Sequence, residues 1–320
     1  MSWQSALACW ILRRQYLPQT RHPEISAEHA RALTSKRVWS PPVPRGWQLR
    51  EQYQESDWPL HGEWLDPEDA PSSARIPTIL YLHGGGYYFC SPRTHRSVSF
   101  GLATRTGARV FSLDYRRAPE HRFPGALDDT LAAYRRLIAA GASPQSLVLA
   151  GDSAGGGLAL AALVALRDAG EALPAGALLF SPWTDLAATG ASIMSNDGAD
   201  PMFCGASIAR AAKLYLGDTP ATHPYASPLY ADLQNLPPLF IQAGSTEVLL
   251  DDARRVAERA IQAGVAVEVK IWTKMPHAWQ LWVPFLPEAR HALDDAAHFV
   301  RRVTSIRDDA QRSSTTSIAR

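Results

Sequence analysis

The chain of 320 residues is 46% hydrophobic and 20% charged, a globular composition that argues against a disordered or low-complexity protein. Its 32 Lys and Arg residues nearly balance its 31 Asp and Glu residues, so charge gives no reason to expect a nucleic-acid partner. The three cysteines form no CxxC pair, and neither HExxH nor a Ca²⁺-binding loop is present. We therefore expect no metal site and a reducing, cytoplasmic compartment.

The first 45 residues predict a helical arm rather than an integral membrane anchor. Residues 6–12 are apolar, but Arg13 and Arg14 follow this run instead of preceding it, which is the wrong polarity for a secretory signal. No stretch reaches the roughly 18 apolar residues of a spanning helix. A membrane-surface or targeting segment stays open as the alternative. An amphipathic helix is indicated by the large apolar residues that fall near one face: Trp3, Leu7, Trp10 and Leu17.

A second helix is predicted over residues 26–38, before a proline-rich break at residues 40–44. In residues 47–53 and 58–64, large apolar residues then alternate with polar ones. A period of two is typical of strands with one buried face, so these segments predict antiparallel strands.

From residue 76 the pattern changes to short uninterrupted apolar runs separated by helix-like segments, which predicts an α/β fold with a parallel sheet covered on both faces. The apolar runs lie at residues 79–82, 110–113, 147–150, 177–180, 239–241 and 265–271. The helix-like segments lie at residues 97–106, 126–140, 154–169 and 250–262. Residues 186–230 interrupt this alternation and predict an insertion over the sheet. The polar residues after 304 predict a frayed tail.

Residues 151–155 read Gly-Asp-Ser-Ala-Gly and match G-x-S-x-G. An apolar strand precedes the motif and an Ala/Leu-rich helix follows it, which is the context in which the serine hydroxyl is exposed on a sharp turn. Ser153 is therefore the predicted nucleophile. The alternative is a glycine-rich turn that contains an incidental serine.

A second glycine motif, His-Gly-Gly-Gly at residues 83–86, follows the first of the apolar runs. Glycines allow main-chain N–H groups to turn toward a developing oxyanion, and we expect donors from Gly84, Gly85 and Ala154. The motif lacks the third glycine of GxGxxG, and the chain has no GxxxxGK[ST], so a phosphate loop is not indicated. The residues expected to support this site are His83, Gly86 and Asp152.

The general base should follow the nucleophile and the acid in the chain. His277 lies in a loop directly after the last predicted strand, where a base emerges at the carboxyl edge of the sheet. The other histidines after Ser153 are less well placed, because His223 lies in the insertion and His291 and His298 lie on a terminal helix. We therefore predict that His277 is the base.

The two glycine motifs together resemble those of the bacterial hormone-sensitive-lipase-like esterases, a branch of the α/β-hydrolases. Residues 114–120, with Phe123-Pro124, and residues 181–185 match further signatures of that family, in order and at compatible spacing. The resemblance covers about residues 75–303. It implies an α/β-hydrolase fold, a mostly parallel central sheet flanked by helices, with a helical cap. We expect the arm (1–45) and the insertion (186–230) to form that cap on a catalytic domain of residues 46–303, and residues 304–320 to form the tail.

The resemblance also points to the catalytic acid. The family carries an acid, usually Asp, in the turn after the strand at residues 239–241, followed by a Leu two residues on and then an acidic pair. Aligning the Leu and the pair places Glu247 on this position. Asp251 stays open as the alternative, although a carboxylate that complements the next helix N-terminus explains it equally.

These residues predict a serine carboxylic-ester hydrolase that forms an acyl-enzyme on small-molecule esters without a cofactor. The resemblance implies short acyl chains and a homodimer. A lactone or an amide or acetyl hydrolase would use the same triad. The plant gibberellin receptors use this fold without the catalytic His, so the presence of His277 favours an enzyme over a binding protein.

Overall fold

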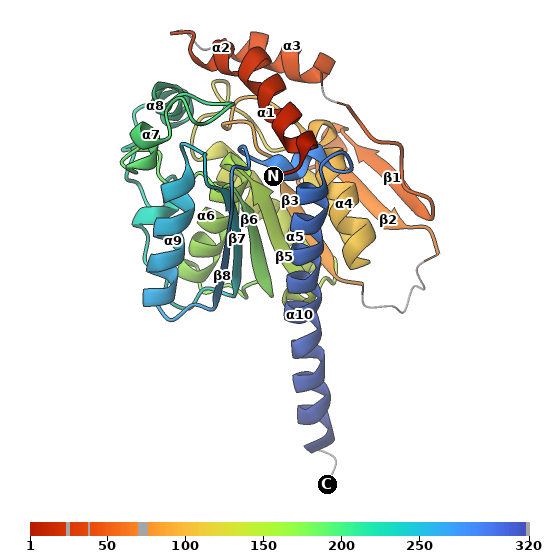
Figure 1. Ribbon diagram of the computed structural model, residues 1–320. Coiled ribbons are helices and arrows are strands. Elements are labelled where there is room, and N and C mark those ends of the chain that lie inside the picture. Colours follow the sequence, from red (N-terminus) through yellow and green to blue (C-terminus); the bar gives the residue numbers. More distant parts are fainter. Residues whose placement is uncertain (24–25, 38, 70–75, 318–320) are drawn as a thin grey trace.

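The computed structural model describes residues 1–23, 26–37, 39–69 and 76–317, and a single eight-stranded sheet forms the centre of this part of the chain (Figure 1). The strands lie in the order β1-β2-β4-β3-β5-β6-β7-β8. Their bounds are β1 Trp47–Gln52, β2 Gly62–Pro67, β3 Thr78–Leu82, β4 Arg109–Leu113, β5 Leu147–Asp152, β6 Gly176–Phe180, β7 Leu239–Gly244 and β8 Val267–Trp272. Strands β3 to β8 pair in parallel, and β1 and β2 add an antiparallel edge. The predicted α/β fold is confirmed.

Helices cover both faces of the sheet because successive strand residues point to opposite sides. In β3, Leu80 and Leu82 pack with residues of α5, α6 and α9, whereas Ile79 and Tyr81 pack with residues of α4 and α10. Burying each such Leu or Ile side chain contributes about 1.5–3 kcal/mol. The helices are α4 Arg96–Thr106, α5 Gly125–Ala139, α6 Ala154–Asp168, α9 Leu250–Gln262 and α10 Pro287–Ser317.

The predicted strand over residues 58–64 is wrong in its position. A 3₁₀ turn, η1 (Glu55–Asp57), precedes this stretch, residues 58–60 form a turn and a bend, and β2 begins only at Gly62. Pro59 lacks the N–H that a strand ladder needs. Gly62 has φ +152°, and a Cβ there would lie 2.1 Å from the Ser112 carbonyl oxygen, so this glycine allows β2 to enter the sheet beside β4.

The polar segment predicted to form a tail after residue 304 continues α10 as helix through Ser317 (Figure 1). Residues 304–317 contain neither Gly nor Pro. Extending a helix that is already packed needs no new nucleus, so a polar segment without helix breakers continues it.

The N-terminal arm folds into α1 (Trp3–Gln15), α2 (Leu17–Thr20) and α3 (Ala27–Arg37), which lie together at the top of Figure 1. The predicted helix end at Val38 lies outside the described residues. We expected the large apolar residues of the arm to find a buried partner, and for Leu17 this is correct. The prediction of burial is wrong for three large apolar residues of α1, because α1 turns the opposite face of the helix toward the protein. The exposed side chains are Trp3, Leu7 and Trp10, and the buried ones are Ser5, Ala8 and Leu12.

The insertion carries two helices, α7 (Ser192–Ser195) and α8 (Gly205–Leu216), and the 3₁₀ turn η4 (Pro228–Tyr230). Further 3₁₀ turns are η2 (Pro92–His95), η3 (Pro144–Ser146) and η5 (Trp279–Trp282). Among the described residues, no helix combines the length and apolar character that crossing a membrane requires.

The packing of α6 against the loop that follows β6 generates a stability prediction. A Cβ on Gly157 would lie 1.9 Å from the Trp183 carbonyl oxygen, a backbone atom that cannot move aside alone. We expect Gly157→Ala to lower the free energy of unfolding by about 1–3 kcal/mol or more, measured by urea denaturation. The control is Gly125→Ala in α5, where the nearest atom, His121 Cβ, lies at 3.3 Å. Equal stability of the two variants would contradict this packing.

Candidate active site

Ser153 lies on the sharp turn between β5 and α6, at φ +55° and ψ −123°. This conformation costs a non-glycine residue on the order of 1–3 kcal/mol, so the surroundings must hold it. The Ser153 N–H donates to the Phe180 carbonyl at 2.8 Å. A Cβ on Gly155 would lie 2.0 Å from the Leu82 carbonyl oxygen, so only glycine allows α6 to start this close to β3. The local sequence therefore folds as the motif predicts.

His277 and Glu247 form a buried pair from the loops that follow β8 and β7. The His277 Nδ1 lies 2.8 Å from Glu247 Oε2, and neither side chain is more than 2% exposed. Glu247 Oε1 accepts the Ser181 hydroxyl at 2.8 Å and also the Gly244 N–H. Ser181 Oγ in turn accepts the Ala278 N–H at 3.1 Å, so one serine holds both the carboxylate and the histidine loop.

The other ring nitrogen of His277, Nε2, is buried and has no hydrogen-bond partner among the described residues. Burial alone would lower the pKa of His277, but the hydrogen bond and charge of Glu247 outweigh it, and the pKa is raised. The nearby carboxylates of Asp200 and Asp152 act in the same direction. The ring is therefore a stronger base than its burial would suggest.

Asp251, the alternative acid, lies elsewhere. Its Oδ2 accepts the Ser192 N–H at 2.9 Å, and its Oδ1 lies 3.6 Å from the Arg254 guanidinium in the first turn of α9. The carboxylate hydrogen-bonded to His277 is that of Glu247.

Gly84 does not meet the expectation of an oxyanion donor. Its N–H donates to Asp152 Oδ1 at 3.0 Å, in a fully buried network. The same oxygen accepts the Tyr81 hydroxyl at 2.6 Å, and Asp152 Oδ2 lies 3.2 Å from His95 Nε2. The carboxylate next to the nucleophile therefore holds the start of the glycine loop and leaves Gly84 no donor to offer.

The N–H groups of Gly85, Gly86 and Ala154 have no acceptor among the described residues. Gly85 has φ +112° and Gly86 has φ +57°, conformations that favour glycine and turn the backbone of the loop. These three N–H groups, rather than that of Gly84, are available to an anion.

His83 has the contacts of a structural brace. Its Nδ1 lies 2.7 Å from the Gly84 carbonyl, and its ring stacks on Tyr115 with centroids 4.2 Å apart. The Tyr115 hydroxyl donates to the His83 carbonyl at 2.7 Å. Burial lowers the pKa of His83 well below its usual value, so the ring is neutral.

The insertion contacts the ring of His277. The Phe203 ring meets the His277 ring edge-on, with centroids 5.1 Å apart. The arm holds the same stretch of the insertion, since Arg13 donates to the carbonyls of Gly198 at 2.7 Å and Ala199 at 2.9 Å. Thr20 Oγ1 donates to the Met202 carbonyl at 3.1 Å.

A second set of hydrogen bonds joins the arm to residues near the glycine loop. Arg31 of α3 donates to the Tyr88 carbonyl at 2.8 Å and to the Ala118 carbonyl at 2.7 Å. It also forms a two-pronged ion pair with Glu120, at 2.8 and 2.7 Å. Sequence reasoning missed Arg31, Ser181 and His95, because each acts through a partner far along the chain. Only Ser181 carried a signal, as part of a family signature.

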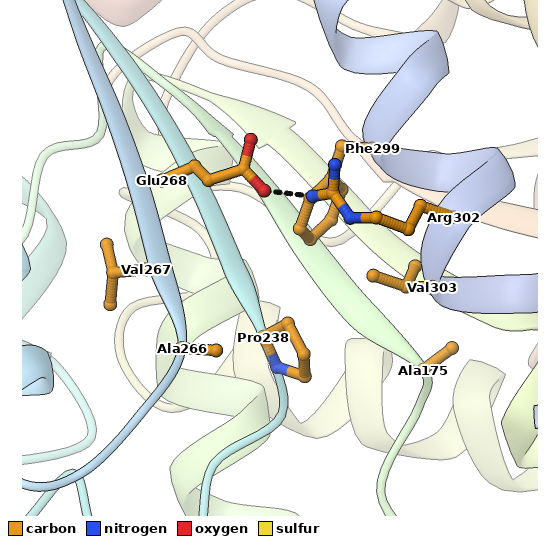
Figure 2. A pocket seen from close by; sticks show the side chains of 8 residues that line it. All are labelled: Ala175, Pro238, Ala266, Val267, Glu268, Phe299, Arg302 and Val303. Carbon is orange, nitrogen blue, oxygen red and sulfur yellow. Dashed lines mark hydrogen bonds and ion pairs between the residues drawn. The ribbon is translucent and has the colours of Figure 1, made fainter. Parts of the chain in front are cut away.

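A hollow of about 360 Å³ lies at the other end of the sheet (Figure 2). It is lined by the residues directly before β6, β7 and β8, by the first two residues of β8, and by Phe299, Arg302 and Val303 of α10. An ion pair between Arg302 and Glu268 spans it. Ser153 and His277 follow the carboxyl ends of their strands, so this hollow is not part of the site. No group of three His, Cys, Asp or Glu side chains in the described part of the chain could hold a metal ion.

Comparison with known proteins places these features in a family. A family model described as alpha/beta hydrolase fold matches residues 79–281. An acetyl-hydrolase of Streptomyces hygroscopicus is 48% identical over 242 residues, 76% of this chain and 80% of its own. An esterase of Acinetobacter venetianus is 39% identical over 69% of this chain and 73% of its own.

Solved structures agree with these sequence matches. The crystal structure of an esterase from the bacterial hormone-sensitive lipase family has a TM-score of 0.85 at 40% identity, covering 95% of this chain and 99% of its own. EstE5, whose crystals were soaked with p-nitrophenyl butyrate, has a TM-score of 0.86 at 37% identity, covering 95% of this chain and 100% of its own.

The contact between His277 and Glu247 predicts how the pKa of His277 changes when Glu247 is replaced. Replacing Glu247 by Gln removes the charge that raises the pKa while burial persists, so we expect the His277 pKa to fall. An NMR titration of the imidazole protons measures it. Asp251→Asn is the matched control and should leave the His277 pKa unchanged. The reverse result would mean that Glu247 is not the controlling carboxylate.

Proposed function

This chain belongs to the α/β-hydrolase fold family, among the bacterial hormone-sensitive-lipase-like esterases, and from that premise we propose that it cleaves small-molecule carboxylic esters through Ser153, His277 and Glu247. The observation that carries the proposal is the buried 2.8 Å contact between Glu247 Oε2 and His277 Nδ1, which leaves Nε2 without a partner among the described residues. An unengaged imidazole nitrogen on a histidine held by a carboxylate suits general-base activation of a serine on a strained turn.

In the proposed reaction, Ser153 Oγ attacks the ester carbonyl carbon while His277 Nε2 takes the hydroxyl proton. Glu247 keeps the other imidazole proton on Nδ1 and stabilises the cation that forms. The tetrahedral intermediate collapses as His277 returns the proton to the leaving alcohol, and an acyl-enzyme remains. Water then attacks the acyl carbon in the same way, the Ser153–acyl bond breaks, and the acid is released.

For the oxyanion we propose the N–H groups of Gly85, Gly86 and Ala154. Gly84 is replaced in this role because its N–H is already bonded to Asp152. Donors fixed by a folded loop stabilise the developing charge without reorganisation, and each contributes on the order of 10²–10³ in turnover.

We further propose that the arm and the insertion form a cap over the substrate. Support comes from the hydrogen bonds of Arg13 and Thr20 to residues 198–202 and from the Phe203 ring against His277. Short acyl chains are the proposed substrates, because the relative that is 48% identical is named an acetyl-hydrolase. Lactones and amides suit the same triad and stay open. The homodimer implied by the family resemblance also stays a prediction.

The proposed nucleophile is tested on p-nitrophenyl esters of increasing acyl length, alongside a lactone and an anilide. We expect ester hydrolysis to fall with chain length and Ser153→Ala to abolish it, because no other group can form the acyl-enzyme. A serine-directed phosphonate should label Ser153, and circular dichroism should show that the variant is folded. Labelling at another residue would refute the assignment.

The cap proposal is tested by deleting residues 1–40. Loss of a wall of the substrate pocket should change the ranking of acyl lengths and raise the Michaelis constant, because the substrate loses contacts and the triad meets water. The control deletion removes residues 305–320 of the predicted polar tail and should leave the ranking unchanged. If deleting residues 1–40 lowers only the melting temperature, the arm is a remote packing element and not a cap.

A further inference from the structure

Asp200 is a fully buried carboxylate that takes no part in the mechanism described above. It lies in the insertion, between α7 and α8, and each of its oxygens is engaged. Oδ1 accepts the N–H groups of Met202 at 2.8 Å and Phe203 at 3.1 Å. Oδ2 accepts the N–H of Val248 at 2.9 Å. One side chain thus joins the insertion to the turn that follows β7.

Two of the three hydrogen-bond partners of Asp200 lie next to proposed catalytic residues. Val248 directly follows Glu247, the residue that holds His277. Phe203, whose N–H the other oxygen accepts, places its ring 5.1 Å from the His277 ring. Asn196 of the same segment donates to the Glu247 carbonyl at 2.8 Å, so the insertion holds the acid turn at two points.

The charge of Asp200 also acts on the histidine. Its negative charge helps to raise the pKa of His277. Burial raises the pKa of Asp200 itself to about 6, against the opposing effects of its backbone donors and of His277. The other ionisable groups that act on Asp200 or lie beside its segment are Glu247, Cys9 of α1 and Arg13, which donates to Gly198 and Ala199.

We propose that Asp200 is a positioning residue for ester hydrolysis: its carboxylate clamps the Phe203 segment of the insertion and the Glu247 turn in one geometry and places a second negative charge near His277. The proposal rests on the proposed function. Hydrogen bonds to an ionised acceptor are roughly twice as strong as neutral ones, so three N–H donors on one buried carboxylate make a stiff junction.

The clamp has a consequence for pH dependence. As pH falls through about 6, Asp200 takes up a proton, accepts its three N–H donors more weakly and loses its charge. His277 becomes protonated over a neighbouring range and can then no longer act as a base. The two groups interact, so the acid limb of the activity profile belongs to the pair rather than to either residue.

The test compares Asp200→Asn with the wild-type enzyme and with Asp197→Asn, a matched control at an exposed carboxylate three residues earlier. An amide nitrogen cannot accept an N–H, so at least one donor loses its partner. We expect kcat on a p-nitrophenyl ester to fall about 10- to 100-fold, the cost of a small misplacement of catalytic groups. The acid limb of kcat/KM should move to lower pH, because His277 loses a negative neighbour. Asp197→Asn should change neither.

Asp200→Glu separates charge from geometry, and it keeps the proposal testable if the Asn variant does not fold. It retains the charge and displaces the carboxylate by one methylene, so the acid limb should stay in place while kcat falls. Wild-type kcat in Asp200→Glu, or an unmoved acid limb in a folded Asp200→Asn, would overturn the proposal. Activity in Ser153→Ala would instead refute the proposed function, so the two failures are distinguishable.

Discussion

A carboxylate removed entirely from water must be paired and hydrogen-bonded, and Glu247 is such a group. Its two oxygens receive Ser181, Gly244 and His277, which come from the loop after β6, the last residue of β7 and the loop after β8. Satisfying one buried charge therefore fixes three neighbouring strand ends relative to one another. The same constraint reaches the histidine loop, since Ser181 also accepts the Ala278 N–H.

The central sheet and the family could be predicted from the sequence because their signals are local. Uninterrupted apolar runs, a strand–Gly-x-Ser-x-Gly–helix succession and a histidine after the last strand each involve neighbouring residues, and both predictions are confirmed. The direction of the Gly84 N–H could not be predicted, because Asp152 sets it from 68 residues away. The same holds for α1, where two apolar faces compete and only the tertiary contact decides that Ala8 and Leu12 are buried instead of Trp3.

The contacts between the arm and the rest of the molecule differ in kind from those of the sheet. Arg13 and Arg31 donate mainly to backbone carbonyls of other segments, whereas the strands and their helices meet through apolar side chains. Hydrogen bonds of this kind contribute about 0.5–3 kcal/mol each, much less in total than the burial of a core helix. An element held largely in this way can separate from the domain at lower cost than α6, which suits the proposed cap.

The presence of Glu rather than the family's usual Asp at position 247 is accommodated by the residues around it. The longer side chain brings Oε1 close enough to receive the Gly244 N–H, and a Cβ at position 244 would lie 3.0 Å from that oxygen. The same Cβ would lie 2.0 Å from the Met275 carbonyl, in the loop that carries His277. Glycine at this position therefore meets two demands at once, room for the Glu247 carboxylate oxygen and close approach of the histidine loop. Because the acid turn and the base loop share this one small residue, a side chain there would displace both members of the pair together.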